Sequence, residues 1–268
     1  MFNKKLAIVG ASGAVGRVFL ELLDEKYPGK KDLYLVASKR SAGNKMSCGN
    51  EEFVIQDIEN FNFSNVDIAF FSAGAKTAEK YAPLAVSSGC TVIDNSSHFR
   101  THEDKLLIVP EVNSKDLCNF ESPGIISNPN CSTAQLVVAL KPIHDLFLIK
   151  RVDVASYQSV SGTGKEGIDE LIEQTKKFLN DEDIHPKVYG AQIAFNVIPA
   201  GNILENNYTD EEIKMSFETN KILDKDIKLS ATCSRVPVLY GHSLAVHVET
   251  EKEINIDRTE EALELDPN

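Results

Sequence analysis

The chain has 268 residues, 42% of them hydrophobic, which is more length than one domain core needs and suits two domains. Its net charge of −12 argues against nucleic-acid binding, which requires a basic face, but leaves small phosphorylated anions open as ligands. No apolar run approaches the roughly 18 residues that cross a bilayer, and the first run (6–9) is too short for a signal peptide, so we expect a cytoplasmic protein that binds no membrane.

The first half of the chain alternates short apolar strands with helices. Helices are expected at 14–27 and 77–88, and the first should carry an apolar face formed by Val15, Val18, Phe19, Leu22 and Leu23. Strands are expected at 6–9, 33–37, 66–71, 91–94, 106–109 and 124–127. This alternation indicates an α/β fold with a Rossmann-type, doubly wound parallel sheet, which we assign to residues 1–129.

The pattern changes in the second half. A long apolar helix is expected at 132–147, broken or kinked near Pro142, and further helices at 165–179 and 209–222, with Thr209 as the N-cap of the last. Strands are expected at 148–159, 227–235 and 241–250. These elements predict a second, mixed α+β domain at 130–250, followed by an acidic and poorly patterned tail at 251–268.

Three glycines with the spacing GxxGxxG lie between the first strand and the first helix, at Gly10, Gly13 and Gly16. Glycine permits a tight turn and the close approach of a pyrophosphate, while the helix N-terminus supplies free N–H groups. The motif is weak by itself and is open to the alternative of an ordinary turn. Its position directly after an N-terminal strand favours a dinucleotide site.

The second strand is followed by Ser38, Lys39 and Arg40. An NAD enzyme usually places an acidic residue here to hold the ribose 2′-hydroxyl, whereas hydroxyl and basic groups suit a 2′-phosphate. The sequence therefore favours NADP as the cofactor, and the alternative is a solvated basic loop.

The five cysteines are dispersed, with no CxxC pair and no Cys/His spacing that suits zinc, so we predict free thiols and no metal site. Cys131 differs from the others because it follows a strand and opens an apolar helix. At that place the helix dipole and free N–H groups stabilise a thiolate and a neighbouring oxyanion. Cys131 is therefore a candidate nucleophile, with a structural thiol as the alternative, and the other four are expected in packing or surface roles.

A cysteine nucleophile needs a proton-transfer partner. His242 is the best candidate, because it lies in a Gly-His pair shortly after the strand that holds Arg235. His144 falls within a predicted helix, His185 within a polar loop and His247 within an alternating strand, so surface or structural roles are expected for them.

Five motifs occur in the order found in aspartate-semialdehyde dehydrogenases: GASGAVG (10–16), NPNCSTAQL (128–136), YQSVSGTG (157–164), EEIKM (211–215) and RVPV–GHS (235–243). Over essentially its whole length the chain resembles this family. The resemblance implies an NADP-dependent reductive dephosphorylation of 4-phospho-L-aspartate to L-aspartate 4-semialdehyde through a cysteine thioester, in lysine, threonine and methionine biosynthesis. It also implies a homodimer assembled through the second domain, whose only other partners are the small-molecule substrate and inorganic phosphate.

The same resemblance implies a role for each matching residue. Cys131 would form the thioester, His242 would be the acid/base, and Gln158 would orient the intermediate. The substrate-binding residues would be Arg100, Asn130, Glu211, Lys214 and Arg235. Without the resemblance, Glu211 and Lys214 would be interpreted as a routine ion pair on a helix. The cofactor-binding residues would be Gly10, Ser12, Gly13, Ala14, Val15, Ser38, Arg40, Ser41, Ser161 and Gly162.

Two features depart from the family pattern. His98 takes a place where the family more often has a small residue, and the tail at 251–268 looks truncated relative to the family. Two alternative functions stay open. An N-acetyl-glutamyl-phosphate reductase shares the chemistry, but its cysteine motif differs and its substrate would not need Glu211. A non-catalytic, truncated NADP-binding paralogue would bind the cofactor without turnover.

Overall fold

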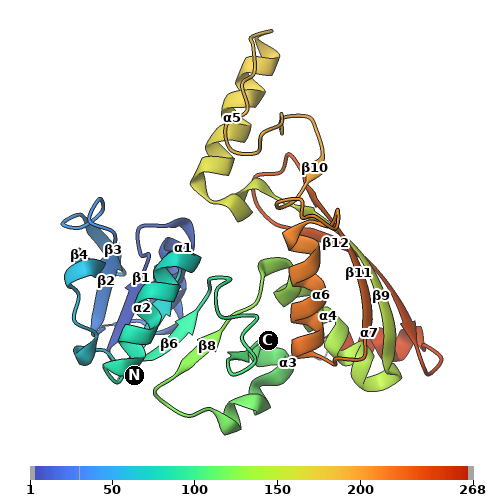
Figure 1. Ribbon diagram of the computed structural model, residues 1–268, viewed down its shortest axis with the longest axis horizontal. Coiled ribbons are helices and arrows are strands. Elements are labelled where there is room, and N and C mark those ends of the chain that lie inside the picture. Colours follow the sequence, from blue (N-terminus) through green and yellow to red (C-terminus); the bar gives the residue numbers. More distant parts are fainter. Residues whose placement is uncertain (1–3, 30, 265–268) are drawn as a thin grey trace. The chain divides into compact units, whose positions relative to one another are not determined.

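The computed structural model describes residues 4–29 and 31–264, and the chain divides into two compact units. Unit 1 comprises residues 1–108 and 114–129, and unit 2 comprises residues 109–113 and 130–268. Unit 1 is a doubly wound, mostly parallel sheet and unit 2 holds a smaller mixed sheet with its own helices (Figure 1). The predicted α/β fold class with a second α+β domain is confirmed.

The sheet of unit 1 has eight strands in the order β3-β4-β2-β1-β5-β6-β8-β7. Their bounds are β1 Leu6–Val9, β2 Leu33–Ala37, β3 Lys45–Cys48, β4 Glu51–Asp57, β5 Ile68–Phe71, β6 Thr91–Asp94, β7 Leu106–Leu107 and β8 Ile125–Ser127. All neighbours run parallel except the β3–β4 pair, which is antiparallel. The carboxyl ends of β1, β2, β5 and β6 therefore meet at one edge of the sheet.

Helices α1 (Ala14–Lys26) and α2 (Ala75–Ser87) cover the sheet through two separate hydrophobic clusters. Ile8 of β1 lies in a buried cluster with Leu20 and Leu23 of α1, whereas Val9 lies in another with Ala78 of α2. Because successive strand residues point to opposite faces, α1 and α2 lie on opposite sides of the sheet. This arrangement explains the unbroken apolar run of β1, as expected for a strand that is buried on both faces.

The packed face of α1 differs from the prediction. Its buried residues are Gly16, Leu20 and Leu23, whereas Val15 and Val18 are about half exposed. The cause is a close approach at Gly16, where an added Cβ would lie 2.6 Å from the carbonyl oxygen of Gly10. The face of α1 that packs inward therefore contains Gly16, Leu20 and Leu23, and the two valines lie at the side of that face.

Unit 2 contains a four-stranded sheet in the order β10-β11-β9-β12. Its strands are β9 Ile149–Gln158, β10 Ile198–Pro199, β11 Lys228–Arg235 and β12 Ser243–Thr250. Its helices are α3 Pro110–Asn113, α4 Cys131–Phe147, α5 Lys165–Leu179, α6 Asp210–Ile222 and α7 Ile256–Glu264. Leu136 and Leu140 of α4 and Met215 of α6 pack on Val152 and Val154 of β9 to form the core.

Several short elements complete the two units. They are four 3-10 turns, at Ile58–Asn60, Phe63–Asn65, Ser114–Asn119 and Val160–Thr163. The last of them follows β9 directly. Helix α4 continues through Pro142 to Phe147, so the expected break is wrong.

The tail at 251–268 is also more ordered than expected, because it contains α7 at 256–264. Asn255 caps this helix, accepting a hydrogen bond at 2.9 Å from the Arg258 N–H, and the Arg258 guanidinium lies 5.9 Å from the centre of the Phe147 ring. The four residues that follow α7 lie outside the described part of the chain.

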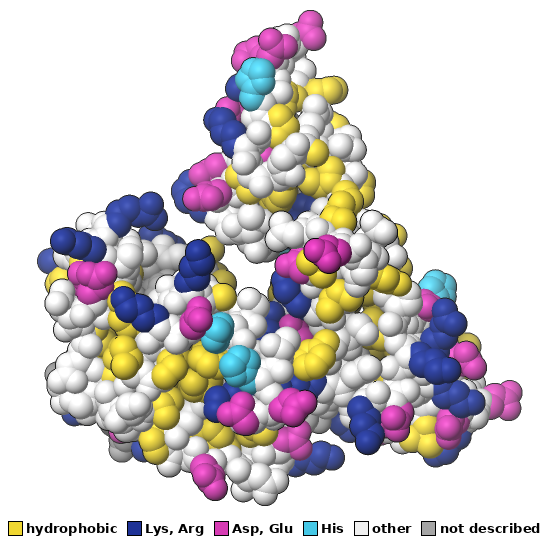
Figure 2. Space-filling model, viewed as in Figure 1, with side chains coloured by type: hydrophobic (Ala, Val, Ile, Leu, Met, Phe, Trp, Pro, Cys, Tyr) yellow, Lys and Arg dark blue, Asp and Glu magenta, His cyan; other side chains and the backbone are white. Residues whose placement is uncertain are grey.

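Helix α5 and the loop after it carry exposed apolar side chains. Phe178 is 51% exposed and Phe195 is 60% exposed, with their ring centres 4.7 Å apart. Figure 2 shows hydrophobic side chains gathered over this part of unit 2. Within residues 4–29 and 31–264, no helix is both long enough and apolar enough to cross a membrane.

Candidate active site

One edge of the unit 2 sheet gathers three of the predicted site residues. Strands β9 and β11 run parallel and end together, with Gln158 and Arg235 as register partners. Strand β12 runs antiparallel to β9 and begins with Ser243 opposite Tyr157, so His242 precedes it at the same edge. The sheet topology therefore brings together residues that lie far apart in the sequence.

Cys131 is the first residue of α4 and faces this edge. Asn130 is the N-cap, and its Oδ1 accepts a hydrogen bond from the Ser132 N–H at 2.8 Å. The Cys131 Sγ lies 3.2 Å from His242 Nε2 and 3.9 Å from Asn130 Oδ1. The cysteine is exposed, and a thiolate at this end of the helix is stabilised by the helix dipole.

The His242 ring is held on its opposite side by Ser159. The backbone N–H of Ser159 donates to His242 Nδ1 at 2.9 Å, and the Ser159 Oγ lies 3.2 Å from the same nitrogen. Burial lowers the pKa of His242 below its ordinary value, the positive charge of Arg235 lowers it further, and the carboxylate of Glu211 acts in the opposite direction. These effects favour a neutral imidazole near pH 7.

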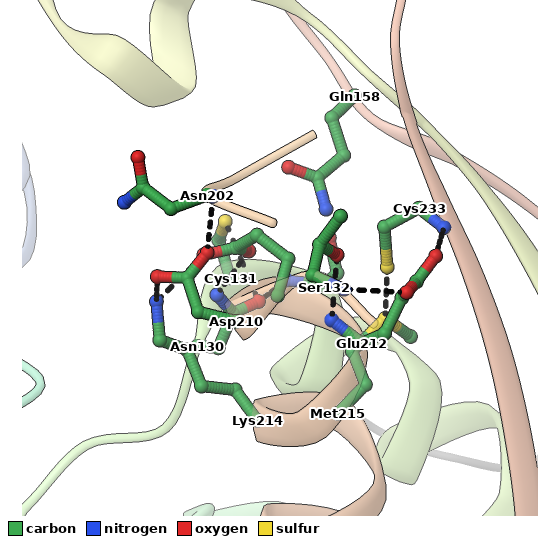
Figure 3. Close-up of polar contacts among 12 residues, drawn as sticks. Asn130, Cys131, Ser132, Gln158, Asn202, Asp210, Glu212, Lys214, Met215 and Cys233 are labelled. Atoms are coloured by element: carbon green, nitrogen blue, oxygen red, sulfur yellow. Dashed lines mark hydrogen bonds and ion pairs between the residues drawn. The ribbon is translucent and has the colours of Figure 1, made fainter. Parts of the chain in front are cut away.

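Helix α6 fixes the side chain of Asn130 (Figure 3). The Asn130 Nδ2 donates to Glu211 Oε2 at 2.8 Å, and the Lys214 Nζ lies 3.0 Å from Glu211 Oε1. Asn130 and Lys214 are labelled in Figure 3. Lys214 also pairs with Asp210 Oδ2 at 2.8 Å. Thr209 and Glu212 form a capping box that fixes the start of the helix, so these groups sit on a rigid element.

Glu218 is a member of this arrangement that the sequence analysis did not single out. Its Oε2 accepts the backbone N–H of Asn130 at 2.6 Å, and the residue is only 1% exposed. Glu211 and Glu218 are seven positions apart and so lie on one face of α6, from which both reach Asn130. That spacing was a signal in the sequence, but the partner lies 88 positions earlier in the chain and no local pattern identifies it.

Arg235 is buried beside the cysteine and histidine. Its Nη1 donates to the Ser159 carbonyl at 2.8 Å, whereas its buried Nε has no hydrogen-bond partner among the described residues. A Cβ added at Gly162 would lie 2.8 Å from that Nη1 and 3.4 Å from His242 Nε2. Glycine at position 162 therefore allows the chain to lie close to the guanidinium and to the His242 ring.

The two remaining predicted residues of this edge lie close by. Gln158 is 1% exposed, and its Nε2 donates to Ser156 Oγ at 3.3 Å. The Ser161 Oγ lies 2.9 Å from Ser159 Oγ, in the turn that follows β9. Both are therefore in the shell around His242 and Arg235.

The other cysteines differ from Cys131 in their surroundings. Cys48, Cys90 and Cys233 are buried and Cys118 is exposed. Burial raises the pKa of Cys90 to about 12 and that of Cys233 to about 11. Figure 3 shows Cys233 held between Glu212, which accepts its N–H at 3.1 Å, and the Met215 sulfur. Protonated, packed thiols of this kind match the packing roles expected for them.

The glycine turn of unit 1 lies at the carboxyl edge of its sheet. Gly10 has a φ of +92°, and an added Cβ would lie 2.8 Å from the backbone of Ser72. Gly13 is the N-cap of α1, so Ala14 and Val15 open the helix. Glycine at position 10 therefore lets the turn pass close to the end of β5 and lead directly into the N-terminus of α1.

The loop after β2 contacts this turn. The Ser12 Oγ donates to Ser41 Oγ at 3.2 Å, and the Ser41 N–H donates to the Ser38 carbonyl at 2.9 Å. Arg40 lies exposed in the same turn. The glycine turn and the hydroxyl groups of Ser12 and Ser41 thus lie together at the edge where nucleotides bind in doubly wound sheets, and Arg40 belongs to the same loop.

Arg100 follows β6 at the same edge of unit 1. It is buried, and its Nη2 donates to the Asn95 carbonyl at 3.0 Å. Asp94 accepts from the Ser96 N–H at 2.9 Å, and burial is the main effect that raises its pKa. The backbone N–H of His98 donates to Ser96 Oγ at 3.2 Å. His98, which departs from the family pattern, therefore belongs to the turn that carries Arg100.

Three other histidines of unit 2 have different surroundings from His242. His144 Nδ1 accepts the Ile149 N–H at 3.2 Å, His185 is exposed in its loop, and His247 is exposed on β12 opposite Asp153. In the part of the chain that the structure describes, no group of three or more His, Cys, Asp or Glu residues could hold a metal ion.

Comparison with known proteins gives the same picture over nearly the whole chain. Residues 5–120 match the family model described as semialdehyde dehydrogenase, NAD binding domain, and residues 140–268 match semialdehyde dehydrogenase, dimerisation domain. The aspartate-semialdehyde dehydrogenase of a Shewanella species is 51% identical over 247 residues, which are 91% of this chain and 73% of that protein.

Solved structures are similar as well. Aspartate semialdehyde dehydrogenase II from Vibrio cholerae, complexed with ASA, has a TM-score of 0.96 and 47% identity, covering 100% of this chain and 80% of that one. An aspartate semialdehyde dehydrogenase with NADP from Candida albicans has a TM-score of 0.73 and 26% identity, covering 97% of this chain and 75% of that one. The chain belongs to the aspartate-semialdehyde dehydrogenase family.

Proposed function

We propose that this protein is an NADP-dependent aspartate-semialdehyde dehydrogenase, which reduces 4-phospho-L-aspartate to L-aspartate 4-semialdehyde through a thioester on Cys131. The observation that carries the proposal is the 3.2 Å contact between the Cys131 Sγ, at the N-terminus of α4, and His242 Nε2. A thiolate at a helix N-terminus beside an imidazole is the arrangement that activates a cysteine nucleophile.

The covalent steps follow from this arrangement. The Cys131 thiolate attacks the acyl carbon, a C–S bond forms, and the C–O bond to phosphate breaks. Bound NADPH would supply the hydride that reduces the thioester. The resulting thiohemiacetal breaks its C–S bond, which releases the aldehyde and restores the thiolate. His242 serves as the acid/base at the sulfur, and Gln158, from the same sheet edge, orients the intermediate.

The substrate carries a phosphoryl group, an α-carboxylate and an ammonium, so it needs cationic and anionic anchors. Arg235 would hold the carboxylate, since a guanidinium is the side chain best suited to bind a carboxylate and its Nε has no hydrogen-bond partner among the described residues. Glu211 would hold the ammonium. Arg100, Asn130 and Lys214 would bind the phosphoryl group. Glu211 favours an amino-acid substrate over N-acetyl-glutamyl phosphate, which has no free ammonium.

We assign the cofactor to the edge of unit 1 that bears the glycine turn. The tight glycine turn and the N-terminus of α1, which begins directly after Gly13, suit a pyrophosphate. Ser38, Arg40 and Ser41 suit a 2′-phosphate, and the Candida albicans relative is described with NADP. Ser12, Gly13, Ala14 and Val15 would complete this part of the site. By resemblance to the family, Ser161 and Gly162 would also bind the cofactor.

The family model for residues 140–268 is a dimerisation domain, and unit 2 carries exposed apolar side chains such as Phe178 and Phe195. We therefore propose a homodimer formed through this domain. In this scheme residues 1–129 bind NADP and residues 130–250 carry catalysis and dimerisation. The product belongs to lysine, threonine and methionine biosynthesis.

The test is the reverse reaction, measured as NADPH formation from L-aspartate 4-semialdehyde and NADP, with and without inorganic phosphate. Phosphate-dependent reduction of NADP is expected, together with a weaker rate for NAD. Cys131→Ala should abolish turnover while NADP binding persists. Turnover in that variant would contradict the thioester mechanism, and NADP binding without turnover in the unmodified protein would indicate a non-catalytic role. N-acetyl-L-glutamate 5-semialdehyde, tested in parallel, separates the two substrates.

A further inference from the structure

The hydrogen bonds around His242 decide where its proton sits. A neutral imidazole carries one N–H and one bare nitrogen, and which is which follows from the partners of each. On one side of the ring, Nδ1 lies 2.9 Å from the backbone N–H of Ser159; on the other, Nε2 lies 3.2 Å from the Cys131 Sγ. A backbone N–H can only donate, so Nδ1 must be the bare nitrogen that accepts it.

The Ser159 amide cannot easily turn away from the ring. Arg235 Nη1 holds the Ser159 carbonyl at 2.8 Å. The next two residues are tied to the segment before His242, because the Val160 N–H donates to the Val238 carbonyl at 2.9 Å and the Ser161 N–H to that of Leu239 at 3.2 Å. Ser159 is fully buried, so its N–H needs an acceptor inside the protein.

The Ser159 hydroxyl does not reverse this conclusion. Its Oγ lies 3.2 Å from Nδ1, further than the amide, and a hydroxyl rotates to donate or to accept as its neighbours require. It can also pair with the Ser161 Oγ at 2.9 Å. The amide has no such freedom. A proton on Nδ1 would therefore meet the amide hydrogen at close range.

We propose that Ser159 is a positioning residue whose backbone N–H fixes His242 as the neutral Nε2–H tautomer, which donates a hydrogen bond to the Cys131 sulfur. In the free enzyme His242 is then a hydrogen-bond donor to the sulfur and not the base that removes the Cys131 proton, so its proposed acid/base role is confined to the steps after the substrate has bound. The exposed thiol loses that proton to water, and the thiolate accepts a hydrogen bond from Nε2–H. No proton is left on Nδ1, and the charge of the site changes only at the sulfur.

The charged groups around the ring agree with a neutral state. The Arg235 guanidinium disfavours an imidazolium, and the Glu211 carboxylate, which acts in the opposite direction, is already paired with Lys214 and Asn130. Gly162 brings no side chain between Arg235 and the ring. The catalytic meaning of this inference rests on the proposed function, but the tautomer is a property of the free protein.

The first experiment is a long-range ¹H–¹⁵N spectrum of the full chain labelled with ¹⁵N-histidine, recorded from about pH 7.5 to about pH 8.5, above the ordinary pKa of histidine. The His242 signals are assigned by their loss in His242→Gln. Nδ1 is expected to resonate as an unprotonated nitrogen and Nε2 as a protonated one throughout. A protonated Nδ1, alone or together with Nε2, would overturn the proposal.

Ser159→Ala is the matched variant, because it removes the hydroxyl and keeps the backbone N–H. The tautomer should be unchanged in this variant. A change to the Nδ1–H form would assign the effect to the hydroxyl and would overturn the role of the amide.

The second experiment follows alkylation of Cys131 by iodoacetamide as a function of pH. The rate should rise with the thiolate while the His242 signals stay those of a neutral ring. Appearance of an imidazolium with the same midpoint as the thiolate would mean that the proton moves to His242, against the proposal. His242→Ala should shift the alkylation midpoint upward by about one pH unit, because the Nε2–H donor is lost.

Neither measurement requires turnover. An Nε2–H tautomer in a protein that does not oxidise aspartate semialdehyde would leave this inference standing and remove the proposed function. An Nδ1–H tautomer in an active enzyme would overturn this inference and leave the proposed function standing.

Discussion

The glycine turn of unit 1 and the cysteine site of unit 2 are built in different ways. The turn is made by backbone, within a few residues, where Gly10 and Gly16 let the chain pass close to itself. The cysteine site is made by side chains, and Cys131 meets His242 from 111 positions away. A site built from backbone can be identified from a local motif, whereas a site built from long-range contacts depends on sheet register and helix packing.

The largest expected effect removes the chemistry of unit 2 and leaves unit 1 intact. Cys131→Ser should lower the rate of NADP reduction by roughly 10⁴-fold or more, because a hydroxyl at this place is a far weaker nucleophile than a thiolate. NADP binding, measured by calorimetry, should be unchanged. Cys118→Ser, which alters another exposed cysteine, is the control. Equal losses in the two variants would show that the effect is not local to the site.

The next variant changes a glycine in the turn after β1 of unit 1. Gly10→Ala should destabilise the protein by roughly 2–4 kcal/mol, because strain at positive φ adds to a clash with the backbone of Ser72. Gly43→Ala is a matched control, since Gly43 also has a positive φ but its added Cβ meets nothing within 4 Å. It should cost only about 1 kcal/mol. Equal urea midpoints for the two variants would exclude the close approach as the reason for glycine at position 10.

The third change removes Glu218, which holds the backbone of Asn130 next to Cys131. Glu218→Ala should cost about 2 kcal/mol of stability, because the buried Asn130 N–H loses its acceptor. It should also lower kcat roughly tenfold to a hundredfold with little change in KM, because Asn130 caps the helix that begins with Cys131. Glu218→Gln keeps an acceptor oxygen and should recover most of kcat. If Glu218→Ala folds and its kcat is unchanged, Glu218 contributes only to stability and does not position the catalytic site.

The smallest expected effect is a dependence of stability on pH. Burial and Arg235 lower the pKa of His242 from 6.5, so the unfolded chain binds a proton there more readily than the folded one. The contribution of the neutral His242 to the free energy of unfolding is therefore fully present above about pH 6.5. It is lost as the pH falls through the lowered pKa of His242 in the folded state. Urea midpoints at about pH 7.5 and about pH 5.5 should differ less in His242→Gln than in the unmodified protein. An identical difference would mean that His242 is not the group responsible.

Most of the elements were predictable, and those that were missed have identifiable causes. The β3–β4 hairpin is rich in charged residues and half exposed at a sheet edge, which hides its alternation, although the two-residue turn at Gly49 and Asn50 was a usable signal. Helix α7 was hidden by its acidic composition, although Asn255 is an ordinary N-cap. The break expected at Pro142 was wrong because packing of α4 on β9 outweighs the lost hydrogen bond.

The sequence by itself determined the alternation of strands and helices, the glycine turn after β1 and the helix that begins at Cys131. Each of these is a local property, set by side-chain periodicity, by glycine and by capping residues within a few positions. Only the tertiary structure decided which histidine faces the sulfur, that Glu218 anchors Asn130, and that the Ser159 amide faces the far side of the His242 ring. These contacts join segments on different strands and helices, and their distances follow from sheet register and core packing, which no short stretch of sequence contains.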